Sequence, residues 1–357
     1  DAILHLGAIT HDASIEDSRR LDLDTRGLYV LLGAAVEAGV RRVVYGSRLD
    51  LFASYPNDVY ITEHWRPMPT DDPDQMMPYL GEMVCREYAR DHRIGVTCLR
   101  IGALVDSEGE KGRDPSNDWV DYRDAAQAFH RALERDESQA INWMRRWAIY
   151  HIVSDHENPR FLLDQARIVG RAPLGYEPAF HFGPSLSENS DNAESSSASA
   201  AVGAGRPKHV LLLGAFGAIA PHITPELSRH YDLKLTDINP GAEGANVSTV
   251  DVTAYDEVLE ASRGMDAIMN WTVIRQERDG AFFVNVVGAW NVMRAAVELG
   301  IRKVVHTGPQ CIRSHYDHDF GVEDVPRAPG TWQYGLTKML SYEICRIYAR
   351  RYGIQTV

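Results

Sequence analysis

The run LGAFGAIA at 213–220 carries the clearest chemical pattern in this sequence. It follows a strand-like apolar run and opens a helix-like stretch, the context in which spaced glycines hold a dinucleotide. Gly214 permits a tight turn, and Gly217 lets the backbone approach a pyrophosphate that free N–H groups at the helix N-terminus then bind. Ala220 stands at the third glycine position, where alanine is also accepted. The alternative is a tight turn without a ligand. The predicted loop contacts are Gly214, Phe216, Gly217, Ala218 and Ile219.

Asp237 ends the next strand-like run, LKLTDI. A carboxylate at this position accepts hydrogen bonds from adenosine ribose hydroxyls and repels a 2′-phosphate, which favours NAD over NADP. The alternative is a solvated aspartate that starts a turn at 239–241. Three further candidates for cofactor contact follow later strands: Asp251, Val252 and Asn270.

The elements that must position these residues follow from the pattern of apolar runs. Short Val/Ile/Leu runs alternate with longer amphipathic stretches, which is typical of buried parallel strands joined by helices. The sequence therefore predicts an α/β fold with a doubly wound parallel sheet of the Rossmann type. In the second half the expected strands are 208–215, 232–238, 266–273 and 302–308, and the expected helices are 218–230 and 284–300.

Three segments of the chain occur twice, in the same order. DAILHLGAIT (1–10) matches DAIMNWTVIR (266–275), AAVEAGVRRVVYGSR (34–48) matches AAVELGIRKVVHTGP (295–309), and CREYAR (85–90) matches CRIYAR (345–350). Between the copies, 184–206 is so rich in Ser, Ala, Asn and Gly that it predicts a flexible linker. The expected organisation is two incomplete tandem copies, 1–183 and 207–357, joined by that linker.

The first copy starts at the equivalent of strand four and has no phosphate loop. Without strands one to three, its first strand would expose an apolar sheet edge. Either residues upstream of Asp1 are missing from this sequence, or a strand from elsewhere pairs there. A processed or excised N-terminus is expected, because the chain begins directly in a strand-like run without an initiator Met.

The second copy resembles the extended short-chain dehydrogenase/reductase family of NAD-dependent epimerases and dehydratases. The resemblance rests on the glycine loop, Asp237, NVVGAWNVMRAA (285–296) and YGLTK (334–338), in that order. The first copy is similar to the same family from its fourth strand onward. Its WVDYRDAAQAF (119–129), YHIVSD (150–155) and GYEP (175–178) look most like uronate-dehydrogenase-like members.

The resemblance implies roles for Tyr334 and Lys338. The tyrosine of YxxxK acts as general acid or base on a substrate hydroxyl, and the lysine lowers its pKa and binds nicotinamide ribose. A phenol of pKa ~10 needs such an ammonium to serve as a base at neutral pH. The alternative is an exposed helical Tyr/Lys pair. The family also has a Ser or Thr at the end of strand five, which hydrogen-bonds the substrate oxygen. Alignment places Pro309 at that position, after Gly308. Thr307 is the nearest substitute, but its side chain would point to the other side of an extended strand unless the turn at Gly308 and Pro309 redirects it.

The first copy departs further from the family pattern. Alignment puts Asp74 at the tyrosine position and Pro78 at the lysine position. Tyr79 is one residue out of register and is followed four residues later by Met83. Ser47 precedes the position of the family hydroxyl, which Arg48 occupies. We therefore expect no independent enzyme in 1–183.

Composition excludes several classes of function. The net charge of -13 disfavours nucleic-acid binding, and no apolar run approaches the ~18 residues of a membrane span. The four cysteines are scattered, which indicates free thiols in a reducing cytoplasm. The polar run SHYDHDFG (314–321) has ligand chemistry, yet it follows strand five as a loop, so no metal is expected.

Two functions remain open. The first is an NAD-dependent oxidoreductase or epimerase/dehydratase that acts on a hydroxyl of a sugar-like substrate, with Tyr334, Lys338 and Thr307 at the reacting atoms. The second is a non-catalytic NAD-binding scaffold, in which the copies form a pseudo-dimer inside one chain or the chain forms a homo-oligomer.

Overall fold

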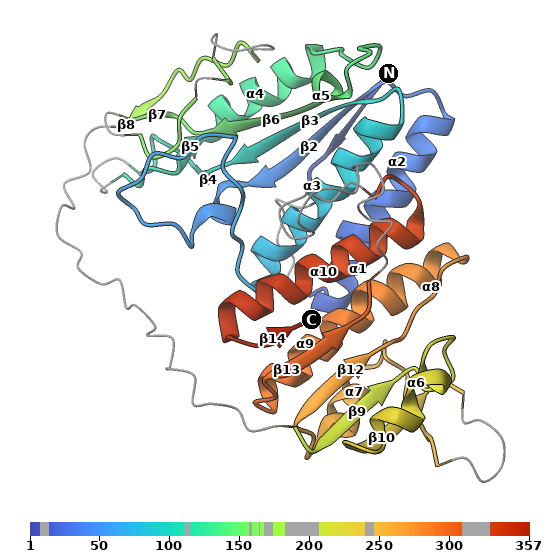
Figure 1. Ribbon diagram of the computed structural model, residues 1–357. Helices are drawn as coiled ribbons and strands as arrows, with labels where there is room; N and C mark the ends of the chain where they lie inside the picture. The colour runs from blue at the N-terminus through green and yellow to red at the C-terminus, as the bar shows by residue number, and fades with distance from the viewer. Residues whose placement is uncertain are drawn as a thin grey trace, which may run out of the picture. The chain divides into compact units, whose positions relative to one another are not determined.

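A computed structural model describes most of the chain, as nine segments. These are residues 1–7, 14–110, 115–156, 159–163, 165–167, 174–182, 207–239, 246–308 and 329–357. The chain divides into two compact units, Asp1–Ser195 and Ser196–Val357 (Figure 1). The division falls within 184–206, which lies outside the described residues.

The second unit is built on one six-stranded sheet in which all neighbouring strands are parallel. Its order, β11-β10-β9-β12-β13-β14, is the 3-2-1-4-5-6 order of a Rossmann sheet and confirms the predicted doubly wound α/β fold. The strands are β9 (His209–Leu213), β10 (Asp232–Asp237), β11 (Ser248–Thr249), β12 (Ala267–Asn270), β13 (Lys303–His306) and β14 (Gln355–Thr356).

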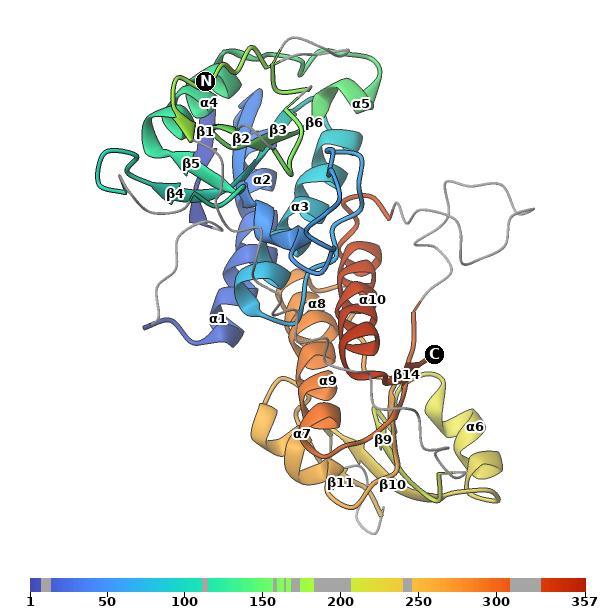
Figure 2. The ribbon, with the colours of Figure 1, turned by 90° about the vertical axis from the view of Figure 1, so that its left-hand side faces the viewer.

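Helices cover both faces of this sheet, which explains why its central strands read as continuous apolar runs. Val210, Leu211 and Leu212 of β9 are fully buried. Figure 2 shows α6 on one side of the sheet and α7 and α9 on the other. The helices are α6 (Ala220–Leu227), α7 (Tyr255–Ser262), α8 (Arg278–Phe282), the π-helical segment η4 (Phe283–Val287), α9 (Gly288–Glu298) and α10 (Gln333–Tyr352).

Helix α6 is shorter than the predicted 218–230. Ala218 and Ile219 belong to the phosphate loop, and Pro221 occupies the first helical turn, where its missing N–H costs nothing. The prediction was wrong at both ends because helix boundaries depend on capping contacts, which the spacing of apolar residues does not show.

The continuous helical stretch Arg278–Glu298 has 21 residues, and its most apolar 18-residue window has a mean hydropathy of 1.2. By length and composition alone it is long and apolar enough to cross a membrane. However, 72% of its most apolar window is buried inside the fold. A core helix passes the same test, so this is weak support for a membrane span.

The first unit contains a four-stranded parallel sheet in the order β1-β2-β3-β6. Among the described residues β1 pairs with β2 alone, which confirms that this strand lies at a sheet edge. Leu4 is 42% exposed there. The strands are β1 (Ala2–His5), β2 (Arg42–Arg48), β3 (Gly95–Ile101) and β6 (Trp147–Ile152), with the two-stranded pairs β4 (Ala103–Val105)/β5 (Trp119–Asp121) and β7 (Asp155–His156)/β8 (His181–Phe182).

In the first unit a π-helical segment, η2, interrupts the helical stretch that runs from α1 to α2, as η4 does between α8 and α9. The helices of this unit are α1 (Asp17–Asp22), the π segment η2 (Leu23–Gly27), α2 (Leu28–Glu37), the 3₁₀ segment η3 (Leu49–Phe52), α3 (Pro73–Asp91), α4 (Tyr122–Glu134) and α5 (Trp143–Arg146). The segments CREYAR and CRIYAR lie in α3 and α10 respectively.

Candidate active site

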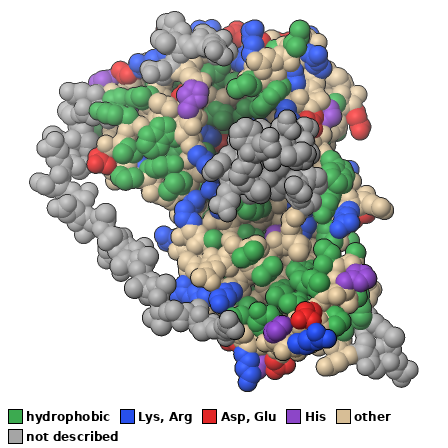
Figure 3. Space-filling view, in the orientation of Figure 1, with side chains coloured by type: hydrophobic (Ala, Val, Ile, Leu, Met, Phe, Trp, Pro, Cys, Tyr) green, Lys and Arg blue, Asp and Glu red, His purple; other side chains and the backbone are tan. Residues whose placement is uncertain are grey.

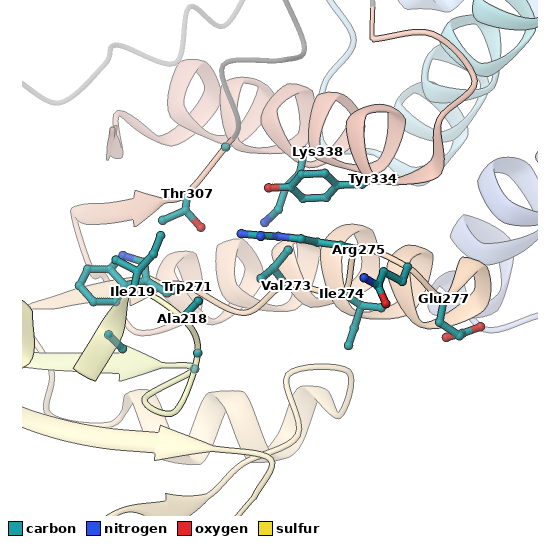
Figure 4. A pocket seen from close by; sticks show the side chains of 15 residues that line it. Ala218, Ile219, Trp271, Val273, Ile274, Arg275, Glu277, Thr307, Tyr334 and Lys338 are labelled. Atoms are coloured by element: carbon teal, nitrogen blue, oxygen red, sulfur yellow. The ribbon is translucent and has the colours of Figure 1, made fainter. Parts of the chain in front are cut away.

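A cavity of about 720 Å³ opens at the carboxyl ends of β9, β12 and β13. Ligands of parallel sheets bind at this edge, and the volume suits a small-molecule ligand. Its described lining comes from four segments: the phosphate loop with the start of α6, residues 271–277 after β12, the end of β13, and the first turns of α10. Seven predicted site residues line it: Gly214, Gly217, Ala218, Ile219, Thr307, Tyr334 and Lys338 (Figure 4).

The two loop glycines are required by backbone geometry. Gly214 has φ +91°, and a Cβ there would lie 3.0 Å from the Trp271 carbonyl carbon and from the Thr272 nitrogen. A Cβ on Gly217 would lie 3.2 Å from the Gly214 carbonyl oxygen. Only glycine fits the first position without strain, so the loop can pass close to the segment after β12.

Asp237 is tied to the phosphate loop. Its Oδ2 accepts a hydrogen bond from the Phe216 amide (2.9 Å), and its Oδ1 accepts one from the Asn239 amide (3.0 Å). A carboxylate has about four acceptor positions, so two remain for ribose hydroxyls. The side chain of Phe216 is 44% exposed, and its amide is occupied by Asp237.

The loop amides nearest the helix are the ones open to a ligand. Within the described segments, the N–H groups of Ala218 and Ile219 donate no hydrogen bond, and both residues line the cavity. Gly214 and Gly217 let the loop backbone come close to a ligand, and the Ala218 and Ile219 N–H groups can then donate to the diphosphate of a dinucleotide. The Asp237 carboxylate can accept hydrogen bonds from its adenosine ribose.

Tyr334 and Lys338 lie one turn apart on α10 and face the cavity (Figure 4). Lys338 is only 2% exposed, and its Nζ donates to the Thr272 carbonyl at 3.3 Å. Burial, together with a smaller contribution from the positive charge of Arg275, lowers the pKa of Lys338 to about 8. The Tyr334 ring packs edge-on against Trp332, with ring centroids 5.0 Å apart.

Thr307 lines the same cavity, although an extended strand would have turned it away. Its amide donates to the Asn270 carbonyl at 3.3 Å, and its Oγ1 lies 3.5 Å from that oxygen. That hydroxyl contact is at the weak limit of hydrogen bonding, so the group retains capacity for a ligand. Pro309, which holds the family's hydroxyl position, lies outside the described residues.

Asn270 serves a buried network beneath the cavity. Its Oδ1 accepts from the Thr272 amide (3.2 Å) and hydroxyl (2.7 Å), and its Nδ2 lies 3.3 Å from His306 Nδ1. His306 Nε2 lies 2.9 Å from the Ser341 hydroxyl. Burial, and then the charge of Lys338, lower the pKa of His306 to about 3. His306 is therefore neutral and links β12, β13 and α10.

This network was not predicted from the sequence, and neither were the hydrogen bonds of Asn285. Asn285 Nδ2 donates to the Ile274 carbonyl and to the Thr337 hydroxyl, both at 2.9 Å. These bonds fix the segment after β12 against α10. A buried asparagine in an apolar helix is the only signal that could have indicated it.

Asp251 and Val252 lie away from the described cavity lining. Asp251 Oδ1 accepts from the amide (2.9 Å) and hydroxyl (2.8 Å) of Thr253. Val252 is 5% exposed and packs against Gly288, where a Cβ would lie 2.8 Å from Val252 Cγ1. Their contact with a cofactor stays a prediction.

In the first unit, the positions aligned with the reactive residues make internal contacts. Asp74 accepts a hydrogen bond from Arg20, and Pro78 lies inside α3. The Ser47 hydroxyl donates to Glu82 at 2.6 Å, so it is already bound to a buried carboxylate.

Glu82 also forms a two-pronged ion pair with Arg100, at 2.9 and 2.8 Å. Tyr79 and Met83 are buried on the same helix as Glu82, and Arg48 pairs with Asp50 at 2.7 Å. These side chains are bound to one another inside the unit, and the Tyr/Lys pair is absent from the aligned positions.

Metal ligands do not cluster in the described part of the chain, where no group of three His, Cys, Asp or Glu could hold an ion. The run at 314–321 lies outside the described residues.

Residues 210–357 match the family profile described as the NAD dependent epimerase/dehydratase family. Uronate dehydrogenase of Pseudomonas putida is 28% identical over 156 residues, covering 42% of this chain and 58% of that protein. Uronate dehydrogenase of Pseudomonas syringae pv. tomato is 28% identical over 157 residues, covering 42% and 56%. The chain therefore spans less than two thirds of the length of these relatives.

Among solved structures, a short-chain dehydrogenase/reductase superfamily protein from Agrobacterium tumefaciens with bound NAD is 24% identical. The match covers 42% of this chain and 47% of that one, with a TM-score of 0.38. The family profile itself names NAD, which agrees with the fit of the glycine loop and Asp237 and confirms the predicted cofactor. In residues 210–357 this chain carries the domain of the NAD-dependent epimerase/dehydratase family, of the extended short-chain dehydrogenase/reductase type.

Proposed function

We propose that this protein is an NAD-dependent oxidoreductase or epimerase/dehydratase that acts on a hydroxyl of a sugar acid or nucleotide sugar. The observation that carries the proposal is the meeting of Tyr334 and Lys338 with the glycine loop in one cavity. Similarity to uronate dehydrogenases supports a sugar-like substrate.

The residues of the second unit divide the work. The Ala218 and Ile219 amides would hold the diphosphate of NAD, and Asp237 its adenosine ribose. The chemistry that bound NAD supplies is reversible hydride transfer. Tyr334 would take the proton of the substrate hydroxyl, and the Lys338 ammonium would stabilise the resulting phenolate. Thr307 Oγ1 would donate to the substrate oxygen.

The test is turnover by the full chain with NAD and a panel of sugar acids and nucleotide sugars. Net oxidation is followed at 340 nm, and epimerisation or dehydration, which leave no net NADH, are followed by chromatography of the sugar products. Lys338→Ala should lower kcat/KM by about 10²-fold or more, the usual scale for losing acid/base catalysis. Lys303→Ala, on β13 outside the described cavity lining, is the matched control and should leave turnover unchanged. Absence of turnover across the panel, with NAD bound, would contradict the proposal.

A second candidate is an NAD-binding scaffold without catalysis. It is favoured by Pro309 at the family's hydroxyl position, and by Arg48, Asp74 and Pro78 at the corresponding positions of 1–183. Under it, 1–183 is a degenerate copy of the domain in 207–357, paired with it as a pseudo-dimer or within a homo-oligomer. The outcome that selects this candidate is binding of NAD in a calorimetric titration by a protein that turns over no substrate of the panel.

A further inference from the structure

Arg275 extends into the cavity beside Tyr334 and Lys338 (Figure 4). Its guanidinium carbon lies 5.3 Å from the centroid of the Tyr334 ring. In the first copy the aligned residue is Thr10, so this arginine is no shared feature of the repeated sequence. It belongs to the copy that carries the phosphate loop.

No acidic partner balances Arg275 within the described segments, where it forms no ion pair or hydrogen bond. Glu277 is the one acidic residue in the described cavity lining. Its two carboxylate oxygens accept from the Asp279 and Gly280 amides and so cap α8. Its charge is therefore directed at a helix N-terminus rather than at Arg275.

Arg275 and Lys338 place two positive charges at one end of the cavity. Their like charges repel each other, and the charge of Arg275 contributes to the lowered pKa of Lys338. Two cations that face one space are relieved by an anion between or beside them.

The cofactor's own diphosphate does not fill this role, because it belongs at the glycine loop. Gly214 and Gly217 lie at the carboxyl end of β9, whereas Arg275 stacks on Tyr334, which reacts with the substrate. The anion that meets Arg275 is therefore carried by the substrate. A planar guanidinium fork binds a carboxylate through two parallel hydrogen bonds.

We infer that Arg275 is a specificity-determining residue that binds the carboxylate of a sugar acid in the cavity of the second unit. The inference rests on the proposed function and narrows its substrate class to anionic sugars. A neutral sugar leaves both cations without an anion, so the site discriminates against it.

The test is calorimetric titration of the NAD-loaded full chain with D-glucuronate, D-glucose and UDP-glucose. We expect glucuronate to bind about tenfold to a hundredfold more tightly than glucose, as for a charge-assisted pair worth 1.4 to 2.8 kcal/mol. Arg275→Gln should abolish that preference. Arg275→Lys keeps the charge without the fork and should retain part of it. Arg278→Gln, three residues on and outside the described lining, is the control and should bind as the parent does.

Three results would overturn the inference: equal binding of glucuronate and glucose by the parent protein, a preference for glucuronate that survives in Arg275→Gln, or a loss in Arg275→Gln confined to UDP-glucose. The last would assign the arginine to a diphosphate. NAD affinity measured in the same variants reports whether they fold. If the protein turns over sugars but its preference for glucuronate over glucose does not depend on Arg275, this inference alone is contradicted. If the protein binds NAD but turns over no sugar, the proposed function is contradicted.

Discussion

At the scale of single residues, Lys338 sets the pH range in which the site can work. Its ammonium is nearly buried, and burial lowers its pKa from 10.5 to about 8. The cationic form is present below that pH and is lost as the pH rises through it. In the proposed function this cation stabilises the Tyr334 phenolate, so kcat/KM should fall on the alkaline side of about pH 8. A pH profile of kcat/KM measures this directly.

Two variants assign that alkaline limb. Lys338→Arg keeps a positive charge at every accessible pH and should remove the limb even if activity is lower. Arg275→Gln removes one cause of the lowered Lys338 pKa and should move the limb to higher pH. An alkaline limb that stays in place in Lys338→Arg would show that another group titrates there.

The residue scale is also where sequence reasoning was least complete. The glycine loop could be predicted from its spacing and context, and Tyr334 and Lys338 from the resemblance to the family; all of them line one cavity. Arg275 and His306 could not, because their roles depend on which side chains from β12, β13 and α10 meet at one edge. Thr307 was predicted from its place in the chain, but its orientation depends on the turn after β13.

At the scale of elements, the strands of the second unit follow the apolar runs closely. The strand order also followed from sequence, since βαβ connections leave few topologies. The π-helical segments η2 and η4 were not predicted, because a single inserted turn hardly changes the spacing of apolar residues. Each precedes a core helix that carries the shared AAVE run, which begins six residues after the start of α2 and seven residues after the start of α9.

The π segment of the first unit holds a carboxyl group that opposes folding at neutral pH. Burial raises the pKa of Asp24 from 3.8 to about 6, although Arg20 lowers it in part. The folded state thus binds this proton more tightly than the unfolded chain. Its stability contribution is present below about pH 4 and is lost as the pH rises through 6.

Asp24→Asn should therefore stabilise the protein at pH 8 and leave it unchanged at pH 4. Counting back from AAVE, Asn285 occupies the same position in the second unit. The raised pKa of Asp24 corresponds to at most about 3 kcal/mol in the free energy of unfolding. Because the side chain is partly exposed, we expect Asp24→Asn to gain about 1–2 kcal/mol. Urea unfolding at both pH values measures it. Asp17→Asn, at a side chain that is 49% exposed, is the control. If Asp24→Asn stabilises the protein as much at pH 4 as at pH 8, titration of Asp24 is not the cause.

At the scale of the whole molecule, the chain carries an acidic excess. Asp and Glu number 50 against 37 Lys and Arg, a net charge of -13. On the face seen in Figure 3, acidic and basic side chains are interspersed and form no single acidic patch. The two cations of the cavity therefore act locally, since charges beyond about 10 Å are screened at 0.1 M salt.

The buried thiols report on each unit separately. Cys85 and Cys98 are fully buried in α3 and β3 of the first unit, and Cys345 is 4% exposed in α10 of the second. Burial raises the pKa of Cys345 to about 12 and raises those of Cys85 and Cys98 as well. All three should react with a thiol reagent only when their unit opens, because the thiolate is the reactive form.

NAD should protect Cys345 more than the other two. The described cavity lining belongs wholly to the second unit, so a cofactor bound there stabilises that unit by RT ln(1 + [NAD]/Kd). At one hundred times Kd this is about 2.7 kcal/mol, or a roughly hundredfold slower labelling of Cys345 when opening limits the reaction. Peptide mass spectrometry follows the labelling of each cysteine in one sample, so that labelling of Cys311 is counted separately from that of the other three. Equal protection of Cys85, Cys98 and Cys345 would mean that NAD stabilises both units alike, which a cavity built by the second unit alone does not predict.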